Sequence, residues 1–205
     1  FNLILINRYR LIKISSKLSL KKIVIFASGS GSSAENIFQK FGKNDGIDVV
    51  KLYCNNPKAY VLKRFEKYEI DKMIFNNSDL GSGKVLEDLI NINPQLIVLA
   101  GFLKKVPKKI TDVFKNKIIN IHPALLPKYG GKGMYGLNVH QKVIDNKDDY
   151  SGFTIHYVNE NYDEGDIIFQ KKIKIRGSNA EDLAKEILEL EHDYYPKIIF
   201  NLLNG

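Results

Sequence analysis

Residues 22–33 read KIVIFASGSGSS, an apolar run that ends in a loop of serine and glycine. The first six residues are rich in β-branched side chains without polar alternation, which is typical of a strand buried on both faces of a parallel sheet. Ile37, Phe38 and Phe41 then lie on one side of a helix predicted over 34–41. A strand that runs through a glycine loop into a helix indicates a doubly wound α/β fold.

The alternation of strands and helices continues along the chain. Further strands are predicted at 48–54, 73–75, 95–100 and 118–121, and helices at 57–65 and 83–91. The later region differs, because 152–158 alternates polar and apolar residues and a turn connects it to a second run at 166–175. These two runs predict an antiparallel hairpin joined to the parallel sheet, and Asn179 is expected to cap a last helix.

Length, charge and cysteine content narrow the class of protein. The 205 residues suit one α/β domain, which we expect over 21–205 after a flexible N-terminal arm at 1–20. The uninterrupted apolar stretch of the arm is too short to span a bilayer, and no signal peptide is evident. A cytoplasmic protein without membrane contact is therefore expected. The net charge is +8, but no basic run is interleaved with aromatic residues, so nucleic acid is not expected as a partner. The single cysteine, Cys54, is expected to be a buried, unreactive thiol in a strand.

The loop Ser28–Ser33 is the first candidate binding site. Its glycines let the backbone approach a ligand closely, and the N–H groups that open the next helix favour an anion such as a phosphate. The loop is not a Walker sequence, and Ala34 stands where the dinucleotide fingerprint has its third glycine. These residues alone leave open a phosphate site, a weaker dinucleotide site and a turn without a ligand.

A second candidate lies at 120–127 (NIHPALLP), at the carboxyl end of a predicted strand, where open α/β sheets bind their ligands. Asn120 and His122 are two residues apart on an extended chain, so their side chains project from the same face. An amide and an imidazole in this arrangement can stabilise an oxyanion, and the imidazole can also transfer a proton near neutral pH. A histidine that is satisfied by backbone groups explains these residues equally well.

Asp163 and two further histidines are ambiguous in isolation. A carboxylate beside an imidazole would raise the pKa of His122, but Asp and Gly are also ordinary residues of a hairpin turn. His156 is interpreted as a core histidine or a support for the active residues, and His140 as structural or peripheral. No set of His, Cys and carboxylate residues has the spacing of metal ligands, so no metal is expected.

Five segments, in this order, resemble the glycinamide ribonucleotide formyltransferases within the folate-dependent formyltransferase family. The segments are SGSGSS (28–33), LAGFLKKVP (99–107), INIHPALLPKYGG (119–131), GFTIHYVNENYDEGDIIFQ (152–170) and EHDYYP (191–196). The resemblance implies a Rossmann-like, mostly parallel twisted sheet with an antiparallel C-terminal extension and a C-terminal helix. It also implies transfer of a formyl group from 10-formyltetrahydrofolate to the amine of glycinamide ribonucleotide in purine biosynthesis, without a metal or a covalent enzyme intermediate.

The resemblance assigns a role to each matching position. Asn120 and a protonated His122 would stabilise the oxyanion, and Asp163 would support the charge of His122 and move protons through water. The substrate would be bound by Gly31, Ser32 and Ser33 at its phosphate and by Glu191 at its ribose or glycinamide part. The folate pocket would be lined by Leu103, Lys104, Lys105, Val106, Asn120, Asn159 and Asp163. The resemblance leaves open whether the protein is a monomer or a homodimer.

Three other classes compete with this prediction. Methionyl-tRNA formyltransferase normally carries an additional C-terminal nucleic-acid-binding domain, and formyltetrahydrofolate hydrolase usually carries an N-terminal regulatory domain that residues 1–20 are too few to form. A phosphate-binding module without catalysis would use only the glycine loop. Convergence of the three candidate catalytic side chains near Ser30–Ser33 would favour catalysis, whereas an Asp163 that points away from His122 would contradict the transferase prediction.

Overall fold

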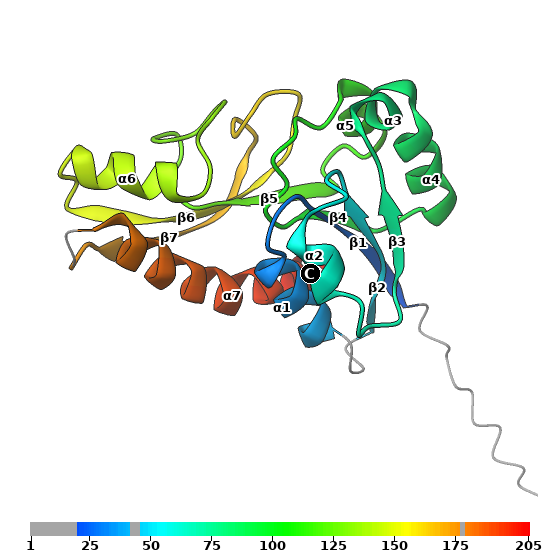
Figure 1. Cartoon of the computed structure of the whole chain (residues 1–205), viewed down its shortest axis with the longest axis horizontal. Coiled ribbons are helices and arrows are strands. Elements are labelled where there is room, and N and C mark those ends of the chain that lie inside the picture. Colours follow the sequence, from blue (N-terminus) through cyan, green and yellow to red (C-terminus); the bar gives the residue numbers. More distant parts are fainter. Residues whose placement is uncertain (1–19, 42–45, 177–178) are drawn as a thin grey trace, which may run out of the picture.

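The structure is a computed structural model that describes residues 20–41, 46–176 and 179–205, so nearly all of the predicted arm at 1–20 lies outside the described residues. Seven strands of the described part form one sheet (Figure 1). The strands are β1 (Lys21–Ala27), β2 (Ile47–Cys54), β3 (Asp71–Ile74), β4 (Leu96–Leu99), β5 (Ile118–His122), β6 (Tyr150–Tyr157) and β7 (Ile167–Lys174).

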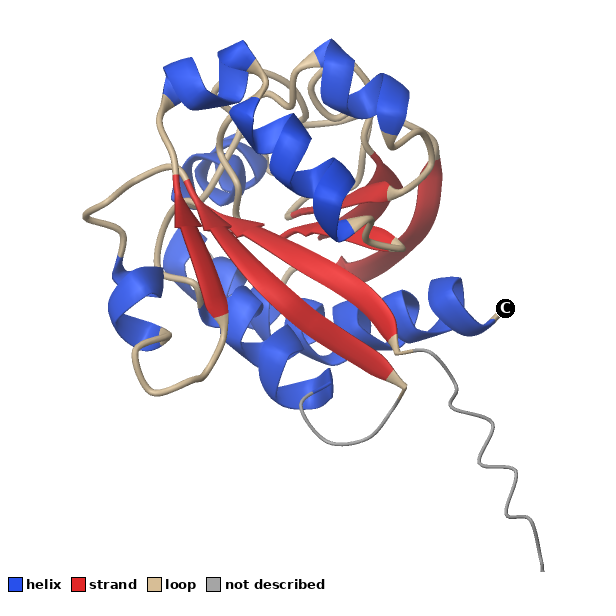
Figure 2. Cartoon of the chain, turned by 90° about the vertical axis from the view of Figure 1, so that its right-hand side faces the viewer, coloured by secondary structure: helices blue, strands red, loops and turns tan. Residues whose placement is uncertain are grey.

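The order of the strands is β3-β2-β1-β4-β5-β6-β7. The first five are parallel, and β6 and β7 are antiparallel additions at the edge of β5. The twist of the sheet is plain in Figure 2. The predicted fold class is therefore confirmed. The chain reverses its direction of travel across the sheet between β1 and β4, and such a switch point leaves a crevice at the carboxyl ends of the strands.

Helices cover both faces of the sheet. They are α1 (Ser32–Phe41), α2 (Tyr60–Arg64), α3 (Asn77–Ser82), α4 (Lys84–Ile92), α5 (Lys108–Val113), α6 (Leu137–Asp145) and α7 (Ala180–Asn204). Along β1, Ile23 and Ile25 pack in the core that includes α1 and α7, whereas Val24 and Phe26 pack in the core that includes α4 and α5. Strand β1 is thus buried on both faces, as its unbroken apolar run predicts.

The helix predictions were right about the long elements and wrong about several boundaries. Helix α2 begins at Tyr60 rather than Pro57, because the Asn56 side chain accepts the Lys58 N–H at 3.0 Å and forms a local turn instead. The short helices α3 and α5 were not predicted. Helix α6 begins at Leu137, and its buried face includes His140. Asn179 caps α7 by accepting the Asp182 N–H, as predicted.

Candidate active site

A cavity of about 630 Å³ opens at the carboxyl ends of the central strands. The loop before α1 contributes Ser30 to its wall, and the first turn of α1 contributes Ser32 and Ser33. The other predicted residues in the wall are Leu103, Lys104, Asn120, His122, Asp163 and Glu191. Residues that lie up to 161 positions apart in the chain, from Ser30 to Glu191, therefore meet at one site.

Asn120 and His122 lie on β5 and face the same side of the sheet, as their spacing predicts. The Asn120 amide Nδ2 lies 3.2 Å from His156 Nε2 on the neighbouring strand β6. The His156 Nδ1 lies 2.8 Å from the Tyr157 carbonyl oxygen, which can only accept. In the neutral ring Nδ1 therefore carries the proton, and Nε2 is left to accept a hydrogen bond from Asn120.

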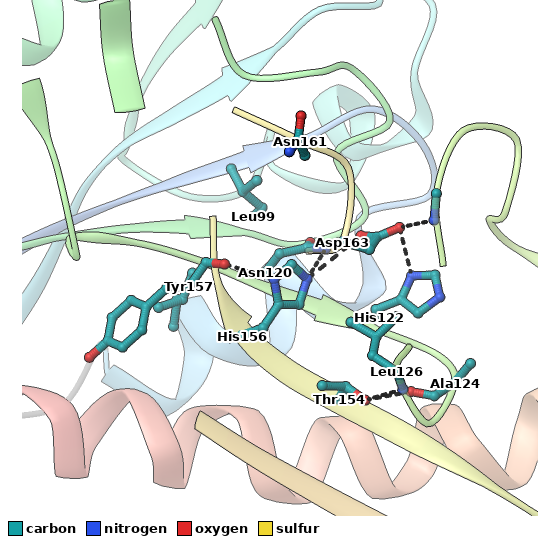
Figure 3. A network of polar contacts seen from close by, with 12 residues as sticks. Leu99, Asn120, His122, Ala124, Leu126, Thr154, His156, Tyr157, Asn161 and Asp163 are labelled. Atoms are coloured by element: carbon teal, nitrogen blue, oxygen red, sulfur yellow. Dashed lines mark hydrogen bonds and ion pairs between the residues drawn. The ribbon is translucent and has the colours of Figure 1, made fainter. Parts of the chain in front are cut away.

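Asp163 lies between two histidines (Figure 3). One carboxylate oxygen is 3.6 Å from His122 Nδ1, and the other is 3.6 Å from His156 Nε2. The Gly131 N–H donates to the first of these oxygens at 2.9 Å. The backbone of Asp163 has a φ of +56°, which an aspartate tolerates better than most residues, so the turn directs the carboxylate inward. Asp163 is therefore both a turn residue and a member of the site.

The electrostatics correct one expectation. Burial lowers the pKa of His122 and outweighs the Asp163 carboxylate and the Tyr129 carbonyl, which act in the opposite direction. The predicted increase in the pKa of His122 is therefore wrong for the free protein, because the ring is 3% exposed and desolvation disfavours its charge. Burial also opposes ionisation of Asp163, but contacts with His156, His122 and Gly131 prevail and lower its pKa.

The start of α1 forms the polar end of the cavity. The first N–H groups of a helix have no partner within it, so those of Ser32 and Ser33 are available to an anion. Gly31 does not line the cavity. Its φ is +76°, and a Cβ atom built on it would lie 2.3 Å from Val61 Cγ2, so glycine is needed there for the close approach of α2. Gly31 thus shapes the loop around the predicted phosphate site.

Glu191 faces the cavity from α7 and is 8% exposed. Its carboxyl group makes no hydrogen bond or ion pair with another described residue, and burial raises its pKa to about 8. The side chain is therefore mostly protonated at neutral pH in the free protein. A protonated carboxyl group that faces a cavity can both donate to and accept from a polar ligand.

The predicted folate residues gather beside the catalytic trio. A narrow extension of about 50 Å³ is lined by Lys104, Lys105, Val106, Asn159 and Asp163, together with the apolar Leu99 and Phe102. Leu103 borders the main cavity and is exposed. Of the predicted folate residues, Lys104, Asn120 and Asp163 line both spaces, so the set surrounds two adjoining hollows that have these three residues in common.

Several residues of the site were missed or misjudged. His140 was interpreted as structural or peripheral; it is not peripheral, because it lines the cavity, is 4% exposed, and its Nδ1 has no partner among the described residues. Burial lowers its pKa to about 4. His156 has the supporting role that was one of its two interpretations. Tyr129 and Gly131 were not singled out, because their backbone contacts leave no pattern in the sequence.

In the ranges 20–41, 46–176 and 179–205, no group of three or more His, Cys, Asp or Glu side chains is arranged to hold a metal ion. Among the described helices, none combines the length and apolar character needed to cross a membrane.

Comparison with known proteins places the chain in a family. The family described as "Formyl transferase" matches residues 21–199. The phosphoribosylglycinamide formyltransferase of Haemophilus influenzae is 33% identical over 187 residues, which are 88% of this chain and 86% of that protein. The chloroplastic enzyme of Arabidopsis thaliana is 35% identical over 189 residues, but the chain spans only 64% of its length and 60% of the length of the Vigna unguiculata enzyme.

A solved structure agrees with these sequence matches. The crystal structure of phosphoribosylglycinamide formyltransferase from Bacillus halodurans superposes with a TM-score of 0.79 and 32% identity, covering 89% of this chain and 95% of that one. The family match and the superposition each cover most of the chain, so the sequence and the fold give the same assignment. The chain belongs to the formyl transferase family.

Proposed function

We propose that this protein is a phosphoribosylglycinamide formyltransferase, which transfers a formyl group from 10-formyltetrahydrofolate to the amine of glycinamide ribonucleotide. The products are formylglycinamide ribonucleotide and tetrahydrofolate. One observation carries the proposal: a single cavity joins the N-terminus of α1 to the side chains of Asn120, His122 and Asp163. A phosphate-binding module without catalysis has no use for this convergence, and the relatives named above act in the same reaction class by name.

The substrate fits the polar half of the cavity. Its phosphate would accept hydrogen bonds from the N–H groups of Ser32 and Ser33, where the dipole of α1 also favours negative charge. Glu191, which lacks a partner and is mostly neutral, would bind a ribose hydroxyl or the glycinamide part. These contacts direct the amine of the substrate toward the catalytic side chains between them.

10-Formyltetrahydrofolate fits the other half and would supply the one-carbon group in an activated form. The narrow extension offers apolar contacts from Leu99, Phe102 and Val106 and polar groups from Asn159 and Asp163. This combination of apolar surfaces and a few polar groups suits a flat heterocycle whose edge carries hydrogen-bonding groups. Leu103, Lys104 and Lys105 border the same two hollows and would contact the rest of the molecule.

The side chains between the two halves would promote direct transfer. The Asn120 amide has a second N–H that can donate to a formyl oxygen as negative charge develops there. His122 would stabilise the same charge when it is protonated, and the carboxylate of Asp163 beside it favours that form. Through a bridging water, Asp163 would also accept the proton that the substrate amine must lose, and the departing folate nitrogen would take up a proton from the same water as its bond to the formyl carbon breaks. The single cysteine, Cys54, is fully buried away from the cavity, so it is not a nucleophile for this reaction.

A formyl-transfer assay tests the proposal. The purified chain would receive 10-formyltetrahydrofolate with glycinamide ribonucleotide in one reaction and charged initiator tRNA in another. We expect formylation of glycinamide ribonucleotide only, because nucleic acid is not an expected partner. Formylation of the tRNA would show that the protein is a different formyltransferase, and release of formate without transfer would show that it is a hydrolase. Separately, we propose that the protein is cytoplasmic, does not bind membranes and acts as a monomer or homodimer.

A further inference from the structure

The segment Tyr129–Gly131 contacts both members of the His122–Asp163 pair through its main chain. The Tyr129 carbonyl oxygen lies 2.7 Å from His122 Nε2. Two residues later, the Gly131 N–H donates at 2.9 Å to the Asp163 oxygen that faces His122. Three consecutive residues therefore fix the ring at one end and the carboxylate at the other.

The contact with Tyr129 selects between the two neutral forms of His122. A carbonyl oxygen can only accept a hydrogen bond, so Nε2 must carry a proton to form this contact. In the neutral ring, Nδ1 is then unprotonated and faces Asp163 at 3.6 Å. This distance is too long for a direct hydrogen bond, which leaves Nδ1 available to a water or a ligand atom beside the carboxylate.

The position of the Tyr129 carbonyl depends on an anchored side chain. Tyr129 has a φ of +58°, in the left-handed region that a bulky residue adopts only when its surroundings impose it. Its hydroxyl donates to Asp148 at 2.9 Å and accepts from the Asn146 amide at 2.7 Å. Both partners lie in the turn after α6, so this turn holds the phenol ring and, through it, the backbone that contacts His122.

We propose that Tyr129 is a positioning residue whose anchored carbonyl keeps a proton on His122 Nε2 and so makes Nδ1 the nitrogen that exchanges protons beside Asp163. When Nδ1 gains a proton, the ring becomes a cation with both N–H groups directed at oxygen atoms. When Nδ1 releases it, the ring returns to the Nε2–H form. The proposal rests on the proposed formyl transfer for its purpose, but the form of the neutral ring is a property of the folded chain.

Several titratable groups around His122 influence the pH at which its ring gains a proton. Asp163 faces Nδ1 from the turn between β6 and β7, and His156 approaches from β6. His140 approaches from α6, and Glu191 lines the same cavity from α7. The test therefore follows the two nitrogens of His122 individually, because a pH profile of activity alone combines all of these groups.

The experiment is an NMR titration of the ¹⁵N-labelled histidine rings in the full chain, combined with steady-state kinetics. Tyr129→Phe removes both hydrogen bonds of the hydroxyl, and Asp148→Ala removes the one that it donates, whereas Asp148→Asn keeps an oxygen that can accept from the Tyr129 hydroxyl. Tyr150→Phe is the matched control, because that exposed tyrosine lies nearby and its hydroxyl has no partner among the described residues. The double variant Tyr129→Phe/Asp148→Ala tests whether the two residues act together.

We expect neutral His122 to be protonated at Nε2 in the wild type, in Asp148→Asn and in Tyr150→Phe. Tyr129→Phe and Asp148→Ala should show a mixture of both neutral forms, a kcat lowered by about tenfold or more, and KM values changed much less. The double variant should be no worse than either single variant, and each variant's thermal unfolding is measured to confirm that it is folded during the assay.

Two results would overturn the proposal: a wild-type ring protonated at Nδ1, or a folded Tyr129→Phe variant that keeps the Nε2–H form with an unchanged or higher kcat. If Tyr129→Phe does not fold, the same two measurements on Asp148→Ala, the form of the neutral ring and kcat, decide instead. A chain that transfers no formyl group but shows the expected change of the ring would refute the proposed function and leave the positioning role of Tyr129 intact.

Discussion

The His156 ring Nε2 accepts a hydrogen bond from the Asn120 side chain across the β5–β6 pair, with 3.2 Å between the two nitrogens. The His156 Nδ1–H is bound to the Tyr157 carbonyl, so the ring cannot rotate without losing a buried contact. This arrangement fixes which way the Asn120 amide faces. A histidine 36 residues away in the sequence thus orients the group that would stabilise the reacting oxygen.

His156 should therefore influence turnover through Asn120, without itself contacting the substrate. We expect His156→Ala to lower kcat by up to about 100-fold, because a misdirected Asn120 amide loses its alignment with the reacting oxygen. His156→Gln should retain more activity, since the Gln oxygen can occupy the position of Nε2 and accept from Asn120. Steady-state kinetics with both substrates measures the difference. Equal losses in both variants would show that His156 acts only through packing.

Asp163→Asn tests the carboxylate between the two histidines. The amide has the same shape and can still accept the Gly131 N–H, but it removes the negative charge that favours protonation of His122. We expect kcat to fall by at least about 100-fold with little change in folding, because the charge acts in the transition state. The neighbouring Glu164→Gln, at an exposed position, is the control. Near-normal turnover of Asp163→Asn would remove Asp163 from the mechanism.

The sequence was sufficient for the sheet but only partly for the site. Unbroken apolar runs identified β1 and β4, because burial on both faces leaves no polar position. The same logic cannot identify α5, a helix of six residues without a side-chain cap, whose start is defined by tertiary packing. For α3 the sequence does contain a start signal, because Asn76 and Asp79 have the spacing of a capping box, but the prediction of helices overlooked it.

The contacts within the site show a second limit of the sequence. The spacing of Asn120 and His122 placed both side chains on one face, which the structure confirms. By contrast, the sign of the shift in the pKa of His122 depends on how deeply the ring is buried, and no local pattern encodes this depth. The contact with Tyr129 likewise depends on a backbone conformation at φ +58°, which the residue type does not favour.

Glu191 predicts an unusual dependence of stability on pH. Its pKa is about 8 in the folded chain, against 4.5 for the ordinary carboxyl group, so the unfolded state binds fewer protons between these values. The free energy of unfolding should therefore fall as the pH rises from about 5 to 8, by roughly 3–4 kcal/mol. Glu191→Gln removes this penalty, so we expect it to raise the midpoint of thermal unfolding at pH 8 much more than at pH 5.

The control for this prediction is Glu189→Gln, an exposed position on the same helix. It should show no such pH-dependent gain over the wild type. Glu191→Gln should also raise the KM for glycinamide ribonucleotide, because the amide nitrogen can only donate, whereas either oxygen of the carboxyl group can accept a hydrogen bond from the substrate. A thermal midpoint that differs from the wild type by the same amount at both pH values would mean that Glu191 is ionised in the folded chain throughout this range.

Gly31 and Gly29 lie in one loop but should respond differently to the same substitution. Gly31→Ala places a Cβ atom 2.3 Å from Val61 Cγ2 at a φ of +76°, so α2 or the loop must move. A Cβ atom on Gly29 would have no atom within 4 Å. We expect Gly31→Ala to lower the free energy of unfolding by about 1–3 kcal/mol and to raise the KM for glycinamide ribonucleotide, because the displaced loop carries the phosphate-binding N–H groups.

Gly29→Ala should leave both quantities close to the wild type. Adding Val61→Ala to Gly31→Ala should recover only a small part of the lost stability, since it removes the Cγ2 methyl group but leaves the Val61 Cβ atom at 2.5 Å and the strain of the left-handed backbone. Urea unfolding and substrate titration measure the two effects separately. A Gly31→Ala variant that loses stability but keeps the wild-type KM would show that the anion binds elsewhere than at the start of α1.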